Sequence, residues 1–225
     1  MDIQKHTDDF FKTLLQFRLS YDVSKHLTEQ TENNWREFEE KQHTNSYPIK
    51  GWGLIAHKSL LDSWTLQEDN LLHEEDLNPS NTGAEINSFP RDTVSIIYIF
   101  SLLEDYGNTV CDELNPSYRK SRQAWHRDIH GDADWNCNSK QQEMLKNFCK
   151  PFGFNLTDVP ISIVEALVKL KKQRNSIIHE LKHSNNFEVY FSYVIAIACC
   201  IYFCLGVAKP EIKLYLWEDY ENKYG

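Results

Sequence analysis

Apolar residues recur every three or four positions along three long segments of this chain, the spacing that places them on one face of an α-helix. In the first segment, from Asp8 to about Glu40, the stripe contains Phe10, Phe11, Leu14, Leu15 and Leu19. The second begins near residues 88–90, where a proline is tolerated in the first helical turn, and stays largely apolar as far as Glu104. The third follows Pro160. The pattern predicts an all-α protein.

The third segment has a polar group within its apolar stripe. The stripe consists of Ile161, Val164, Leu167, Val168, Lys171, Arg174, Ile178 and Leu181. An ordinary solvent-facing arginine would not share the spacing of core residues, because the core-facing side of a surface helix is apolar. We therefore expect Arg174 to face an interface or a pocket.

A run of about twenty residues, 189–208, contains no charged side chain. Its length meets the criterion for a membrane span. Tyrosine and cysteine residues make it less apolar than most spans, and it lacks a basic flank. We expect a helix buried in a bundle or a dimer interface and no membrane contact, with a membrane anchor as the alternative.

Turn-rich segments and the limits of the apolar patterns divide the chain into three parts. Residues 1–87 form a helical N-terminal extension with a long loop, which carries an acidic cluster between Glu68 and Asp76 and a turn-rich run at 78–83. Residues 88–209 form the main helical bundle, and 210–225 form a C-terminal tail. The acidic cluster is typical of a solvated surface, although it offers ligands for a cation.

Composition narrows the class of protein. The net charge of −9 and the pI near 5.5 argue against a protein that coats nucleic acid through a broad basic surface. They leave room for a small cationic site. Six cysteines occur without a Cys-x-x-Cys pair, which favours buried thiols in a reducing compartment. With no signal-peptide pattern at the N-terminus, we expect a cytoplasmic protein.

The candidate chemistry lies at the end of the third helix, in the sequence Arg174-Asn175-Ser176-Ile177-Ile178-His179. A guanidinium neutralises phosphate oxygens, and an imidazole exchanges a proton near neutral pH. This combination suits the handling of a phosphodiester. The alternative is an ordinary helix end, where basic residues and histidine favour the negative end of the helix dipole.

Two further groups of polar residues add to this motif. Glu104 and Asn108 are four residues apart in the second apolar helix, where they either contribute to a polar site or mark its emergence into solvent. His126 and His130 are also four apart, and with Asp132 or Cys137 they offer metal ligands. No firm ligand spacing supports such a site, so the expectation is a basic and aromatic loop and no metal or other cofactor. The arginines and Trp125 of that segment also suit RNA phosphates and a base.

The Arg-Asn-x-x-x-His array, the apolar final helix and the earlier core helix with Ser101-Leu102-Leu103-Glu104-Asp105-Tyr106-Gly107-Asn108 resemble the HEPN superfamily over roughly residues 88–209. This resemblance implies an antiparallel HEPN-like helical bundle that forms a homodimer with the two motifs facing each other. Many members are metal-independent endoribonucleases of toxin–antitoxin, phage-defence or CRISPR-associated systems, and others are inactive binding modules. An antitoxin or a defence-complex protein is therefore a further expected partner.

The residues then take the following expected roles in RNA cleavage. His179 acts as general base or acid, and Arg174 stabilises charge on the phosphorane. Asn175 orients the imidazole or the phosphate, and Glu104 holds Arg174 or fixes the histidine tautomer. Substrate contacts are expected from Lys171, Lys172 and Asn108. The products would carry 2′,3′-cyclic phosphate and 5′-hydroxyl ends.

One geometric difficulty bears on this site. At about 100° per residue, Arg174 and His179 point roughly 140° apart on a straight helix. A single pocket then needs a distorted helix, the long reach of arginine, or a second subunit.

The alternative function is a non-catalytic helical module that binds a protein partner or a nucleotide.

Overall fold

The computed structural model describes residues 2–43, 79–118, 124–130, 138–180, 184 and 186–224. Every regular element in this part of the chain is helical, which confirms the predicted all-α class. The helices are α1 (Ile3–His43), α4 (Pro79–Leu114), α5 (Asn138–Cys149), η2 (Leu156–Asp158), α6 (Ile161–Glu180), α7 (Phe187–Ala208) and α8 (Trp217–Tyr224). The acidic cluster at 68–76, and Asp132 and Cys137, lie outside the described residues.

Two compact units divide the chain. The first consists of residues 1–20 and 92–225, and the second of residues 21–91. The sequence-based boundary at residue 87 differs from this division, because the first turns of α1 belong to the same unit as the later helices. In the second unit the guanidinium of Arg91 lies 5.3 Å from the ring centroid of the buried Tyr21.

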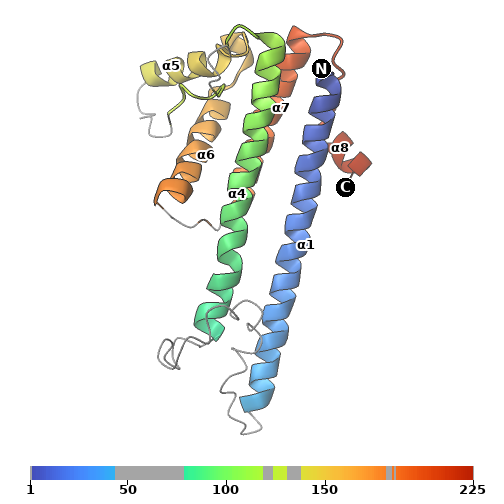
Figure 1. The fold of residues 1–225 in the computed structure, drawn as a ribbon, viewed down its shortest axis with the longest axis vertical. Helices are drawn as coiled ribbons and strands as arrows, with labels where there is room; N and C mark the ends of the chain where they lie inside the picture. The colour runs from blue at the N-terminus through green and yellow to red at the C-terminus, as the bar shows by residue number, and fades with distance from the viewer. Residues whose placement is uncertain are drawn as a thin grey trace. The chain divides into compact units, whose positions relative to one another are not determined.

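Aromatic side chains hold the first unit together. Phe10 of α1 stacks on Tyr106 of α4 with ring centroids 4.3 Å apart, and Phe17 meets Tyr98 at 4.7 Å. Since the residue numbers rise on α1 as they fall on α4, the two helices are antiparallel here (Figure 1). Burial of such large rings is the main favourable term in packing these helices.

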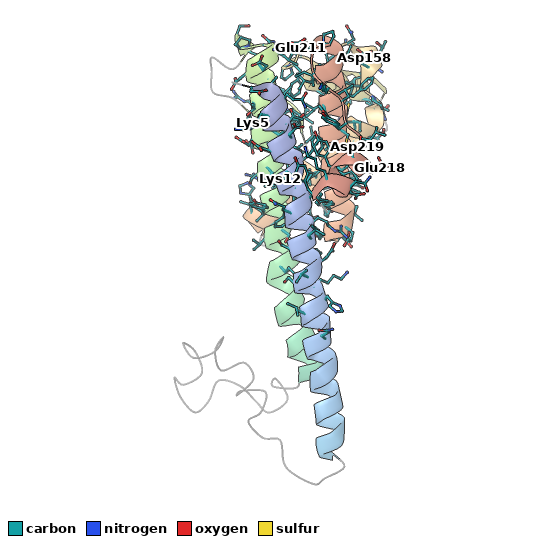
Figure 2. The ribbon with its side chains drawn as sticks, turned by 90° about the vertical axis from the view of Figure 1, so that its right-hand side faces the viewer. Lys5, Lys12, Asp158, Glu211, Glu218 and Asp219 are labelled. Carbon is teal, nitrogen blue, oxygen red and sulfur yellow. The ribbon has the colours of Figure 1, made fainter. Side chains whose placement is uncertain are left out.

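Helix α8 lies against the start of α1. Tyr220 stacks on Phe11 at 4.9 Å and donates a hydrogen bond of 2.6 Å to Oδ1 of Asp8. Figure 2 shows Glu218 and Asp219 of α8 at about the level of Lys12 on α1. The expected C-terminal tail is therefore partly packed onto the bundle.

Helices α6 and α7 are consecutive in the chain and contact each other. Their bounds agree closely with the apolar patterns, whereas α4 begins at Pro79, earlier than the expected 88–90. The turn-rich run at 78–83 is typical of a loop, but the helix includes it from Pro79 onward, because a proline in the first position of a helix needs no backbone N–H. On α6 the buried residue near the C-terminal end is Ile177, and Ile178 is exposed.

By length and hydropathy, α7 is the one described helix able to cross a bilayer. In its most apolar stretch 44% of the residues are buried inside the protein, including Phe191, Val194 and Ile201. A core helix of a soluble bundle passes the same test, so this is weak evidence for a membrane span. The expected burial of residues 189–208 in a bundle is met on one face of the helix.

Candidate functional site

The site is built around a turn, residues 125–128, that follows α4 in the chain. Trp125 of this turn is almost fully buried and packs directly on Gly107 of α4. A Cβ atom at position 107 would lie 2.5 Å from Cε2 and 2.8 Å from Cδ1 of the indole. Glycine at this position therefore lets the turn approach the helix closely.

Hydrogen bonds from two helices fix the same turn. Asn108 of α4 accepts a hydrogen bond of 3.3 Å from the backbone N–H of Trp125. Lys171 of α6 donates from Nζ to the carbonyl oxygens of His126, at 2.8 Å, and of Ile129. Asn108 and Lys171, both expected to contact substrate, thus have partners within the protein.

The fixed turn brings His126 to Glu104. Nε2 of His126 lies 3.7 Å from Oε2 of Glu104, which is an ion-pair distance and longer than a hydrogen bond. The histidine is buried, and neither ring nitrogen has a hydrogen-bond partner among the described residues. A buried polar group without a partner is costly, so the nearby carboxylate is its main source of electrostatic compensation.

Electrostatics at Glu104 reflect the cations around it. The neighbouring His126 side chain, together with the charges of Arg174 and Lys171, lowers the pKa of Glu104 below its ordinary value, although burial acts in the opposite direction. In the sequence this carboxylate was expected to hold Arg174 or the His179 tautomer. The histidine that it contacts is His126.

Burial disfavours the charged form of Lys171 as well. It lowers the pKa of the ammonium group to about 8, and the charge of Glu104 offsets only part of this shift. The amine is still mainly protonated at neutral pH, and its two carbonyl acceptors hold it in one position. Lys171 of α6 is therefore a positive charge that is held in place against the turn.

Arg174 lies on the Glu104 side of α6. Its guanidinium carbon is 5.7 Å from the ring centroid of Phe100, and that ring also meets His126 edge-on. One N–H group donates to Oδ1 of Asn175 at 3.2 Å. Among the described residues Arg174 forms no ion pair within 4 Å, so the other N–H groups of its fork retain their capacity for an external anion.

His179 lies elsewhere on the same helix. Helix α6 is continuous from Ile161 to Glu180, and His179 is exposed in its last turn. The structure thus brings Arg174, Glu104, Lys171 and His126 together and leaves His179 apart from them. A local distortion of the helix, one of the three ways to unite the motif, is absent from this segment.

A pocket of about 370 Å³ lies beside the motif. We name it the α6 pocket; its lining residues are Ile129, His130, Lys171, Lys172, Asn175, Ser176 and Glu180. No group of three or more side chains that could hold a metal ion occurs among the described residues, and Asp132 and Cys137, the other ligands considered with His126 and His130, lie outside them. The pocket includes the two lysines that were expected to bind substrate.

Sequence reasoning missed His126 as the partner of Glu104. One available signal was Gly107, because a glycine inside an otherwise apolar helix indicates close approach of another segment.

No family model, curated protein or solved structure matches this chain. The site must therefore be interpreted from its own geometry.

The pKa of Glu104 gives a test of this arrangement. Ionised Glu104 stabilises the folded state above the carboxyl's unfolded pKa near 4.3, and this contribution is lost as pH falls through the lower folded value. We expect the urea midpoint of the wild type to fall more steeply between pH 6 and pH 3 than that of Glu104→Gln. Parallel pH profiles for the two proteins would contradict the Glu104–His126 interaction.

Proposed function

We propose that this protein is a metal-independent endoribonuclease of the HEPN type that acts as a homodimer, within a toxin–antitoxin or phage-defence system. The observation that carries the proposal is the state of Arg174. Its guanidinium is positioned by Phe100 and Asn175 and has Glu104 nearby, yet it forms no ion pair among the described residues. A preorganised cation with spare donors suits the developing charge on a phosphorane.

His179 supplies the proton-transfer group of this proposal. It is exposed, so a substrate or a second subunit has access to it. Because it points away from Arg174 on a regular helix, one subunit does not offer both groups to the same phosphate. The proposed site therefore pairs Arg174 of one subunit with His179 of another.

One face of α7 supports self-association. Val189, Phe203 and Val207 are exposed, and together with the intervening residues they form a stripe at alternating spacings of four and three: Val189, Tyr193, Ala196, Cys200, Phe203 and Val207. This spacing is typical of the seam between two packed helices. The segment has no charge after Glu188, so two copies would meet without like-charge repulsion.

The chemistry follows from these two groups. An imidazole takes the proton of the ribose 2′-hydroxyl, whose oxygen attacks the adjacent phosphorus, and the 5′-oxygen of the next nucleotide leaves with a proton. Arg174 stabilises the charge on the phosphoryl oxygens by paired N–H contacts. The products are a 2′,3′-cyclic phosphate and a 5′-hydroxyl.

The test is RNA cleavage in a buffer that contains EDTA. We expect the wild type to yield 2′,3′-cyclic phosphate ends and His179→Ala to be slower by about 10²- to 10⁴-fold, the usual contribution of general acid–base catalysis. His26→Ala removes an exposed histidine of α1 and serves as the matched control, with unchanged activity. Equal cleavage by all three proteins, or none by the wild type, would refute the nuclease proposal and leave a binding module.

A further inference from the structure

Charge is distributed unevenly along the α6 pocket. Lys171 and Lys172 lie at one end of its helical wall, and Glu180 lies nine residues further on. At 1.5 Å per residue this separation is about 13 Å along the helix axis. An anion is therefore attracted to the lysine end of the pocket.

Lys171 provides a preorganised donor at that end. An ammonium group has three N–H bonds, and two of them are directed to the carbonyl oxygens of His126 and Ile129. The third is available to a ligand in the pocket that this residue lines. Because the side chain is already held in place, binding an anion costs little further side-chain entropy.

The rest of the lining suits a phosphate with its attached sugar. Lys172 contributes a second, exposed positive charge, while Asn175, Ser176 and the imidazole of His130 contribute uncharged or titratable hydrogen-bonding groups. The volume of about 370 Å³ is near the lower end of ligand pockets, which span about 300 to 1,000 Å³. It is sufficient for roughly one nucleotide.

We propose that the α6 pocket binds one unpaired nucleotide of a single-stranded RNA, with its phosphate at the Lys171–Lys172 end. The inference rests on the proposed function, because it names the substrate class of that site. Asn175 lines the pocket and lies one helical turn before His179, so the bound nucleotide is a close neighbour of the scissile one.

A concave pocket of this size favours a single strand over a duplex. In an A-form duplex the bases are paired and the backbone lies on a convex surface, so proteins recognise duplex RNA mostly by shape across its grooves. An unpaired nucleotide is free to leave the stack and enter a pocket.

The experiment measures binding without cleavage. The probe is a fluorescent single-stranded 2′-O-methyl RNA oligonucleotide, which lacks the attacking hydroxyl, in EDTA at several salt concentrations. Lys172→Met is compared with Lys169→Met, which removes the same charge from an exposed position on α6 outside the pocket. Lys171 is left intact because its loss would also release the turn.

We expect Lys172→Met to weaken binding about tenfold, as for loss of a charge-assisted hydrogen bond. The slope of log affinity against log salt should fall by about 0.7 for this variant and by less for Lys169→Met. A 2′-O-methyl duplex of the same sequence should bind the wild type more weakly and fail to distinguish the two variants.

Several results would overturn the inference. These are no binding of the single strand by the wild type, equal effects of the two substitutions, or a duplex that binds as tightly as the single strand. The two proposals fail separately. If binding depends on Lys172 but the protein does not cleave RNA, the pocket proposal stands and the nuclease proposal is refuted. If the protein cleaves RNA but both variants bind equally, the nuclease proposal stands and the pocket proposal is refuted.

Discussion

Gly107→Ala should lower the free energy of unfolding by about 2–3 kcal/mol, the upper part of the range for an overpacked core. For a chain of this size that corresponds to a fall in Tm of roughly 5–10 °C. The added Cβ would collide with the indole of Trp125, which is 1% exposed and has no room to move away. Thermal denaturation followed by circular dichroism measures the change.

The effect of Gly107→Ala on the free energy of unfolding should change sign when Trp125 is absent. Alanine is a better helix former than glycine by about 1 kcal/mol, and that gain is masked only by the collision. In a Trp125→Ala background, Gly107→Ala should therefore be neutral or stabilising. If it remained destabilising there, the contact between Gly107 and Trp125 would not be the cause.

Gly206 of α7 is the matched control for this experiment. A Cβ at this position would lie 2.7 Å from Cδ2 of Leu214, but Leu214 is 48% exposed and its side chain can turn aside. We expect Gly206→Ala to change the unfolding free energy by less than about 1 kcal/mol. The comparison separates a rigid obstacle from a movable one.

A heterodimer of two inactive variants should regain RNA cleavage. If each site combines Arg174 of one subunit with His179 of the other, a dimer of Arg174→Ala with His179→Ala contains one intact site and one doubly defective site. Its activity should be about half that of the wild type. Each variant alone should be slower by about 10²-fold or more, as expected from loss of charge stabilisation or of proton transfer.

The two chains would be co-expressed with different affinity tags and purified through both tags. The control pairs Arg174→Ala with the double variant Arg174→Ala/His179→Ala, which leaves no intact site. Recovery in the first pair alone supports the composite arrangement. If the wild type is active and a confirmed heterodimer of the two variants shows no recovery, Arg174 and His179 act from the same subunit.

The sequence was sufficient for the all-α class and for the bounds of α6 and α7. In these segments the apolar spacing is strong, and Pro160 and the polar run before Phe187 punctuate it. The start of α4 could not be predicted, because asparagine, serine and glycine at 78–83 are typical of a turn. The backbone there is helical from Pro79 nevertheless.

The site was predictable only in part, for a similar reason. The spacing of Arg174 placed it among core positions of α6, and in the structure its guanidinium lies over Phe100 and its charge lowers the pKa of Glu104. The contact of His126 with Glu104 depends on a turn that packs between two helices. Such non-local packing leaves no periodic pattern in the chain.

Residues 171–176 of helix α6 contribute to three different parts of the site. Arg174 faces Phe100, Lys171 holds the turn, and Asn175 and Ser176 line the pocket. A single inserted or deleted residue within this stretch would rotate everything beyond it by about 100° relative to what precedes it, so at least one of these groups would lose its position. Related chains should accordingly vary in residue type at exposed positions such as Lys169, while the number of residues from Lys171 to Glu180 stays constant.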